Sequence, residues 1–229
     1  MREASSNTRL LIRAGVNIAA CLGLSLSGAC TSLLPQPIES PVFMSLDRAP
    51  AAPNYVRPQA APSAPTVLVE PPRAAPGFDS QRIIYLRQEH RLEYFSRHQW
   101  IDTPARMVAP LMVAALEQSG AFQSVLLAPA SAAGDLRLET EDLRLQQEFI
   151  SRPSRVRFSL RALLLDNRSR RVLAEREFEA VVAATSDDPY GGVIAANRAV
   201  TSVLQELAAF AARAADAHSL ASALPLARP

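Results

Sequence analysis

The sequence predicts an α/β fold in a single domain with two main helices, and three observations support this. The chain has 229 residues, of which 48% are hydrophobic and 20% charged, which is ordinary for a domain with one core. Several short runs alternate apolar and polar residues, as strands do. Two longer runs, which begin near Pro104 and Pro189, carry apolar residues at helical spacing instead.

The charge and the cysteines exclude several classes of site. The formal net charge is +2, which is too small and too evenly mixed for nucleic-acid binding, where a dense basic stripe is expected. Cys21 and Cys30 are the two cysteines of the chain. Because both precede the predicted folded region, that region has neither a disulfide nor a thiolate metal site. We expect no nucleic-acid partner, no metal and no cofactor.

Residues 1–29 are typical of a secretory signal. Arginines are spread through residues 1–13, and residues 14–29 contain no charge, which is the order of the basic and apolar regions of a signal peptide. The apolar run is too short for a comfortable membrane span. The segment therefore predicts export from the cytoplasm.

The signal ends in LSGAC, which resembles a bacterial lipobox, where the cysteine becomes the lipidated first residue of the mature protein. We favour Cys30 as this residue, with residues 30–40 as a tether. Cys21 is the alternative, because the IAA before it fits the local pattern better but leaves an apolar run near the lower limit of length. An ordinary cleaved signal with a chance cysteine is the second alternative. With Cys30 as the anchor, Ser32 in the second mature position favours the outer membrane.

The predicted domain covers residues 41–214 and begins with two strands separated by a loop. Residues 41–46 (PVFMSL) are a short strand candidate. Residues 47–65 are rich in alanine and proline, and the prolines exclude a helix or an interior strand, so this part is an extended loop. Residues 66–70 (TVLVE) form the next strand, which ends at the two prolines that follow.

Residues 82–120 predict strand, turn, strand and helix. The runs RIIYLR and HRLEYFSRHQW are rich in branched and aromatic residues. Thr103 is placed to cap the helix, Pro104 to occupy its first position and Gly120 to end it.

The apolar residues of this helix fall on one side of it. Those with core-facing spacing are Met107, Leu111, Ala115 and Leu116. Pro110 lies inside the run, where it predicts a kink or a late start. After the helix, residues 122–128 read as another strand.

Residues 135–184 are the clearest antiparallel region. The even positions of VRFSLRALLLDN and RVLAEREFEAVV are mostly apolar, whereas arginines and glutamates occupy the odd positions. With Asp166 to Arg170 as the hairpin loop, one register pairs Arg161 with Glu175 and Arg157 with Glu179. Upstream, the apolar residues change from even to odd positions, which predicts a β-bulge near residues 141–142.

The last element is a helix that opens at Asp187-Asp188-Pro189. Its apolar stripe comprises Val193, Val200, Val203, Leu204, Leu207, Phe210 and Ala211. Gly191 and Gly192 are interpreted as loosening the helix entry. Residues 215–229 are predicted to be a frayed end and a disordered tail.

Motifs of known catalytic chemistry are absent from the sequence, so we expect a protein that is not an enzyme. His90 and His98 flank one strand, but without a third ligand they are better explained as solvent-facing residues than as a metal site. Glu139, Glu141 and Asp142 could serve acid-base chemistry; a solvated strand face is the favoured interpretation.

Candidate partner-binding residues lie in the stretch with the densest aromatic content. They are Trp100, Tyr94 and Arg97. Aromatic residues dominate interface hot spots, although Trp100 is better explained as a core residue between the strand and the helix.

The order of these features resembles the ABC-type transport auxiliary lipoproteins, the family that includes the paraquat-inducible protein C. The resemblance rests on the lipobox-like Cys30, the FMSL strand, TVLVEPPRAAPGFDSQRIIYLR, the segment from HRLEYFSRHQW into the helix, and the Ala-x-Asn-x-Ala pattern around Asn197. It covers residues 42–212. No single motif is diagnostic, and the specificity lies in the order and spacing.

The resemblance implies a three-layer α/β/α domain with a mixed, largely antiparallel sheet. It further implies a non-catalytic lipoprotein that carries palmitate, faces the periplasm, and assists an ABC transporter of phospholipids or other hydrophobic molecules. Its partners would be an MCE-domain periplasmic protein with a permease and an ATPase, and homo-oligomerisation into a ring is an analogy from the same family. The alternative function is a periplasmic lipid-carrying binding protein.

Overall fold

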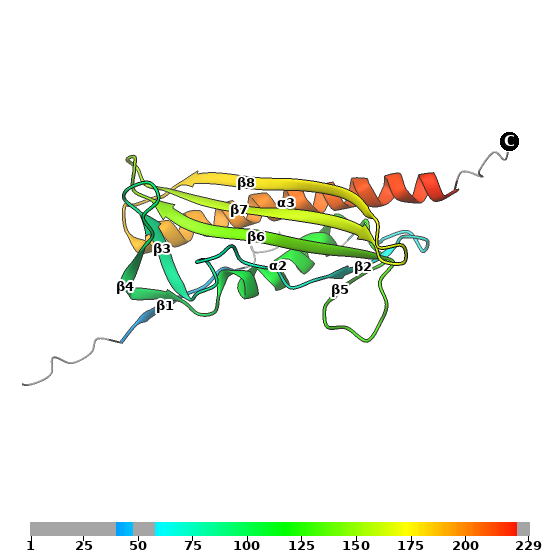
Figure 1. The fold of residues 1–229 in the computed structure, drawn as a ribbon, viewed down its shortest axis with the longest axis horizontal. Coiled ribbons are helices and arrows are strands. Elements are labelled where there is room, and N and C mark those ends of the chain that lie inside the picture. Colours follow the sequence, from blue (N-terminus) through cyan, green and yellow to red (C-terminus); the bar gives the residue numbers. More distant parts are fainter. Residues whose placement is uncertain (1–39, 48–57, 224–229) are drawn as a thin grey trace, which may run out of the picture. The chain divides into compact units, whose positions relative to one another are not determined.

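The computed structural model describes residues 40–47 and 58–223. The signal, the tether up to residue 39, both cysteines and most of the Ala/Pro-rich loop lie outside the described residues. The elements, labelled in Figure 1, are β1 (Val42–Met44), β2 (Thr66–Val69), β3 (Arg82–Leu86), β4 (Glu93–Trp100), α2 (Pro104–Ser119), β5 (Ser124–Leu127), β6 (Leu136–Glu148), β7 (Arg155–Asp166), β8 (Val172–Ala183) and α3 (Pro189–Ala223).

The strands form one mixed sheet around β6. On one side β6 pairs with β7, and β7 with β8, all antiparallel. On the other side the first part of β6 pairs with β2 and its last part with β3, both parallel. The sheet continues from β2 to β5 and from β3 through β4 to β1. The predicted mixed sheet with a long antiparallel region is confirmed.

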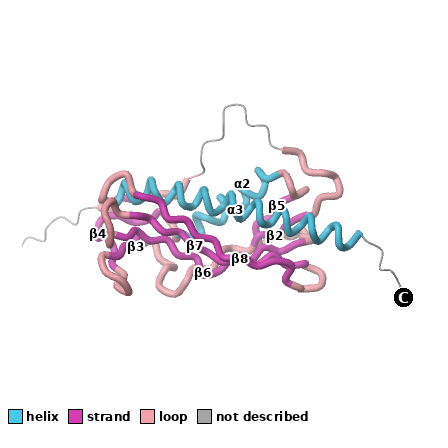
Figure 2. Tube along the Cα trace, turned by 90° about the horizontal axis from the view of Figure 1, so that it is seen from above, coloured by secondary structure: helices cyan, strands magenta, loops and turns pink. Residues whose placement is uncertain are grey.

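Both helices lie on the same face of this sheet (Figure 2). The predicted α/β class is confirmed, but the third layer is not. The reason lies in the strands themselves: Val156, Phe158 and Leu160 are buried on the side of α3, whereas the odd positions 157, 159 and 161 carry Arg, Ser and Arg. A sheet with one apolar face can bury helices on that face only.

Helix α2 runs from Pro104 to Ser119 and is ended by Gly120 at φ 67°; Thr103 occupies the N-cap position as predicted, but its side chain makes no capping hydrogen bond. The helix continues past Pro110, so the late start is wrong. Pro110 lies on the exposed side of the helix, where water can hydrogen-bond the carbonyl that its missing N–H leaves without a partner. The core-facing stripe is wider than predicted: Val108 and Met112 are fully buried, whereas Leu111 and Ala115 are only half-buried. In the described residues neither helix combines the length and hydropathy of a membrane span.

The β7–β8 hairpin forms as predicted, but its register differs by two residues. Arg161 is opposite Glu177 rather than Glu175. The change arises at the turn, where a bulge lies between Leu164 and Leu165 and Arg170 adopts φ 59°. A shift of two keeps every side chain on its own face.

The predicted ion pairs nevertheless form across this hairpin. Arg161 reaches Glu175 at 2.8 Å, and Arg157 contacts Glu179. Both glutamates are diagonal neighbours in the observed register, and long side chains can bridge that separation.

The β-bulge predicted in β6 is confirmed. The pairing with β7 shifts between Glu141 and Arg144, and Asp142 adopts φ 55°. Because of the extra residue, Leu138 and Leu143 both face the core and both are fully buried. The bulge thus reconciles the even and odd apolar positions of this strand.

Helix α3 begins at a side-chain cap and is longer than predicted. The Gly191 N–H donates to Oδ1 of Asp188 at 2.7 Å. The helix continues to Ala223, so residue 215 is not the start of a disordered tail. Ala215 is buried, and Nε2 of His218 lies 3.1 Å from Oδ2 of Asp166 in the hairpin, contacts that extend the ordered helix.

Gly192 allows α3 to approach β6 closely. This role differs from the predicted one, which was to loosen the entry of the helix. A Cβ atom at this position would lie 2.6 Å from Cδ of Gln147. Gln147 is itself buried and donates to Oγ of Ser154 at 3.0 Å, so its side chain is held in place.

Replacing Gly192 with alanine is therefore expected to lower the free energy of unfolding by about 1–3 kcal/mol, the usual cost of overpacking. Denaturant unfolding measures the change. In a double-mutant cycle with Gln147→Ala, the combined loss should be smaller than the sum of the two single losses. Strict additivity would contradict the proposed clash.

Candidate functional site

Trp100 is buried in the core rather than presented to a partner. It is the last residue of β4, lies opposite Met44 of β1, and is 2% exposed. Its ring lines a small internal space together with Ile83 and Val193. This agrees with the core interpretation and leaves Trp100 without the surface that a partner anchor needs.

Tyr94 and Arg97 are both exposed on β4, in a part of the strand whose pairing with β3 is irregular. The guanidinium of Arg82 lies 5.1 Å from the centroid of the Tyr94 ring, which is a cation–π contact. The structure brings neither residue together with Trp100 on one surface. Their binding of a partner stays a prediction.

The two histidines do not form a site. His90 is exposed in the β3–β4 turn, and His98 is half-buried with its ring centroid 6.4 Å from that of Phe95. Among the residues that the structure describes, no three His, Cys, Asp or Glu side chains are grouped as metal ligands would be.

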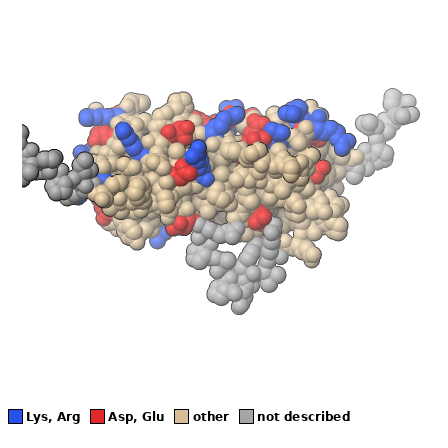
Figure 3. Space-filling view, turned by 90° about the horizontal axis from the view of Figure 1, so that it is seen from below, with Lys and Arg blue, Asp and Glu red and all other residues tan. Residues whose placement is uncertain are grey.

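The main polar surface of the domain is the face of the sheet opposite the helices, which we call the open face. It is formed by the outward-pointing residues of β6, β7 and β8. Figure 3 shows acidic and basic side chains intermixed along the upper edge of the view, where this face lies. The alternation that buries one side of these strands places the charged residues together on the other.

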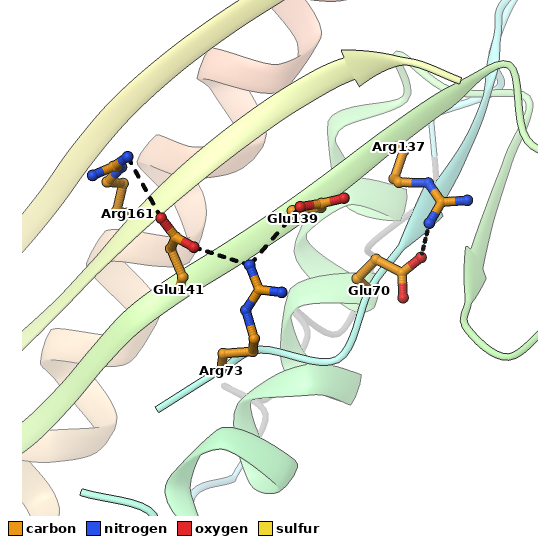
Figure 4. Close-up of polar contacts among 6 residues, drawn as sticks. All are labelled: Glu70, Arg73, Arg137, Glu139, Glu141 and Arg161. Atoms are coloured by element: carbon orange, nitrogen blue, oxygen red, sulfur yellow. Dashed lines mark hydrogen bonds and ion pairs between the residues drawn. The ribbon is translucent and has the colours of Figure 1, made fainter. Parts of the chain in front are cut away.

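A network of ion pairs crosses the open face (Figure 4). Arg73, from the segment after β2, contacts Glu141 at 2.9 Å and Glu139 at 3.9 Å. Arg161 of β7 contacts the same Glu141 at 3.5 Å. A separate pair joins Arg137 to Glu70.

This network accounts for the acidic residues considered for acid-base chemistry. Glu139 and Glu141 share one arginine, and Asp142 contacts Arg144 at 3.0 Å. Each carboxylate therefore has a guanidinium beside it, as expected for a solvated strand face and unlike a pair of carboxylates tuned apart for proton transfer.

A shallow hollow of about 450 Å³ lies on the open face beside the β6 bulge. Arg144, Arg157 and Arg161 line it together with Glu177 and Glu179. Glu177 forms no ion pair with any other described residue. It is therefore the carboxylate of this face with the most freedom to meet a partner's cation.

Glu148 is a partly buried carboxylate of the open face that is held by hydrogen bonds. Its carboxylate accepts hydrogen bonds from Nε of Arg157 at 2.7 Å and Nε2 of Gln146 at 2.8 Å. Burial is the largest single influence and works to raise the pKa of Glu148, but these two hydrogen bonds and the positive charges of Arg157 and Arg155 together hold the pKa below its ordinary value of 4.5.

A lowered pKa in the folded state means that ionised Glu148 stabilises the fold above pH 4.5. This contribution is lost as the pH falls through the lower folded-state value. We expect Glu148→Gln to lower the free energy of unfolding by about 1 kcal/mol at neutral pH. This value lies between the typical contribution of an exposed ion pair and that of a buried hydrogen bond to a charged group.

The difference between wild type and Glu148→Gln should disappear when unfolding is repeated in acid below this range. Glu89→Gln, at an exposed glutamate of the β3–β4 turn, is the matched control and should change stability at neither pH. A difference that persists in acid would show that the carboxylate charge is not its cause.

Two features escaped the sequence. Arg73 is one of several arginines in an irregular segment, and no periodicity signals its place in the network. Asn197 joins α3 to the chain after β1: its Oδ1 accepts from the Asp47 N–H at 2.7 Å, and its Nδ2 donates to the Ser45 carbonyl at 3.3 Å. The Ala-x-Asn-x-Ala pattern marks Asn197 in the sequence, but it does not indicate that this residue contacts the chain after β1.

Comparison with known proteins gives a consistent result. Residues 45–208 match the family model of the ABC-type transport auxiliary lipoprotein component. A search of curated proteins returned no similar sequence.

Similar solved structures support the fold. A Xanthomonas campestris protein of family DUF330 has a TM-score of 0.65 and 22% identity, covering 78% of this chain and 99% of its own. An uncharacterized protein has a TM-score of 0.53 and 13% identity, covering 76% and 98%. The PelC dodecamer from Paraburkholderia phytofirmans is less similar, with a TM-score of 0.39, 16% identity and coverage of 67% and 95%.

The family model spans most of the chain and most of the described fold, from the residue after β1 to Ala208 in α3. The fold itself is shared with the structures of the two most similar proteins above. The chain therefore belongs to the family of ABC-type transport auxiliary lipoprotein components.

Proposed function

We propose that this protein is a non-catalytic, lipid-anchored component of an envelope transporter, and that its open face docks an MCE-domain periplasmic partner that works with a permease and an ATPase. Membership in a family of transport auxiliary lipoproteins supports the transport role. The transported molecule would be a phospholipid or another hydrophobic compound, carried by the partner.

The observation that carries this proposal is the contrast between a filled core and a broad charged face. The space between the sheet and α3 has a volume of about 10 Å³, and the groove between α2 and α3 about 60 Å³. Pockets that enclose small molecules usually measure about 300–1,000 Å³. The larger hollows of the described surface, of about 440–540 Å³, are open to solvent and do not enclose a ligand. The small interior spaces therefore favour a docking role over the alternative of a lipid-carrying protein.

The open face suits a polar protein partner. Its arginines and glutamates are intermixed, and several of its ion pairs are partly exposed, so that they can exchange partners at small cost. Complementary charges of this kind contribute to the rate and specificity of association more than to its affinity. A docking role therefore needs no deep pocket on this protein.

Membrane attachment through Cys30, in the outer membrane, completes the proposal. Two or more acyl chains are needed for stable anchoring, and the lipoprotein family of the chain supports such a modification. Metabolic labelling with palmitate, combined with membrane fractionation, tests the anchor in Cys30→Ala and Cys21→Ala variants. We expect only Cys30→Ala to lose label and membrane recovery; loss in Cys21→Ala alone would reassign the anchor.

Docking is tested by pull-down with the purified MCE-domain protein of the same transporter. Glu177→Arg should weaken the complex about tenfold, since a mismatched interface charge can cost 1.4 kcal/mol or more. Glu89→Arg makes the same charge change at the β3–β4 turn, away from the open face, and should bind like wild type. Equal binding by all three proteins would remove the open face as the docking surface, and no binding by wild type would contradict the partnership.

A further inference from the structure

A patch of exposed apolar side chains lies at the end of the domain where the described chain begins. We define the entry patch as the exposed residues Phe43, Ile101 and Tyr190 together with the half-buried Ile194. Phe43, Ile101 and Tyr190 are 56%, 62% and 64% exposed, among the most exposed large apolar residues of the described chain. Single exposed apolar residues are ordinary, but a contiguous group indicates a contact surface.

The structure brings these residues together from three separate parts of the chain. Phe43 of β1 lines a shallow groove of about 440 Å³ with Tyr190 and Ile194 of α3. Ile101 borders β1, because its N–H donates to the Met44 carbonyl at 2.8 Å. Among the strands that the structure describes, β1 pairs with β4 alone, so the patch lies at an edge of this sheet.

Basic and acidic groups surround the groove. Arg198 lines it, is exposed, and has no ion pair with another described residue. Asp47 also lines it, with its carboxylate accepting a hydrogen bond from Ser45 at 2.9 Å. An apolar aromatic surface with an unpaired arginine beside it fits a phospholipid surface, where aromatic rings lie at the headgroup level and a guanidinium binds phosphate.

The position of the patch along the chain selects its occupant. The chain from Cys30 to Pro41 can reach at most about 40 Å, so a lipid at Cys30 keeps the entry patch close to the bilayer. Tethering of this kind gives a high effective concentration, so even a weak affinity for lipid is enough for lasting contact. A protein partner, unlike the bilayer, would not be held beside the entry patch by this tether.

We propose that the entry patch rests on the phospholipid surface that holds the acyl chains, and so sets the orientation of the domain on the membrane. This inference depends on the lipid anchoring proposed above. It leaves the open face, which belongs to other strands, available to the transport partner.

Depth-dependent fluorescence quenching tests the proposal with the full chain, produced with its own signal and reconstituted in vesicles of phosphatidylethanolamine and phosphatidylglycerol. Tyr190→Trp and Phe43→Trp place a reporter in the patch, and both positions are exposed enough to accept it. Val172→Trp is the control. Val172 is 46% exposed and is the first residue of β8, at the opposite end of that strand from the start of α3. The natural Trp100 is buried and provides the background.

With brominated acyl chains in the vesicles, both patch variants should lose fluorescence, whereas wild type and Val172→Trp should not. Vesicle-bound protein without quenching at either patch position would overturn the entry patch and leave the anchoring intact. Equal quenching of Val172→Trp would overturn the orientation. Absence of the protein from the vesicle fraction would overturn both proposals. If, in unbrominated lipid, the tryptophans of the patch variants became shielded from water as the protein concentration rose, the patch would be assigned to contact with a second copy of the chain.

Discussion

Replacing Trp100 with alanine is expected to lower the free energy of unfolding by about 3–5 kcal/mol, the usual cost of deleting a large buried aromatic side chain. Trp100 is 2% exposed and belongs to the main core cluster. Because domains of this kind are stable by only about 5–15 kcal/mol in total, the variant should unfold at a markedly lower denaturant concentration.

The size of this effect follows from where Trp100 lies. Its backbone N–H donates to the Gln81 carbonyl at 2.7 Å, and its ring lies between β3 and the first turns of α3. Removing the ring would open a cavity where two elements meet, and neither the sheet nor the helix can collapse into it without losing other contacts.

Trp100→Phe and Tyr94→Ala separate a core role from a partner role. Trp100→Phe keeps most of the apolar volume and should cost less than half as much as Trp100→Ala. Tyr94→Ala, at a 38% exposed position of the same strand, should have a small effect on unfolding. A Trp100→Ala protein of unchanged stability that no longer binds the transport partner would show that Trp100 is an interface residue after all.

The local parts of the fold could be predicted because their signals are local. Pro104 and Gly120 lie at the two ends of helix α2 as predicted, with Thr103 at the N-cap position, and the change of apolar phase in β6 located the bulge at Asp142. In each case the residues that determine the feature lie within a few positions of one another, so the local sequence is enough to predict it.

The sheet register and the layers could not be predicted from the same signals. Pairing Arg161 with Glu175 places opposite charges together and keeps the apolar residues on one face. The observed pairing of Arg161 with Glu177 does the same. Only the geometry of the turn, with its bulge and Arg170 in the left-handed region, decides between them. The single layer of helices follows from the polar odd positions 157–161 of β7 and 175–179 of β8, whereas the third layer was implied only by the resemblance.

The candidate surfaces were predictable to different extents. The charges of the open face are visible as alternating arginines and glutamates, although Arg73 joins them from an irregular segment. The entry patch combines Phe43 and Tyr190, which are far apart in sequence and share no pattern. Tertiary contacts alone create that surface.

Replacing Phe158 with alanine should have an effect of the same order, about 3–5 kcal/mol of unfolding free energy. Phe158 is fully buried in the middle of β7, under α3, and is among the largest side chains of the described chain that are excluded from solvent. Thermal and denaturant unfolding measure the loss, and two-state behaviour in both should be checked first.

Ser159→Ala is the matched control, because the next residue of the same strand points to the open face. It should change the unfolding free energy by less than about 0.5 kcal/mol, as surface substitutions do. A large loss at Phe158 beside almost none at Ser159 is what a sheet with one apolar face requires. Comparable losses at the two positions would instead mean that the open face is buried, and would contradict both the single helical layer and the availability of that face to a partner.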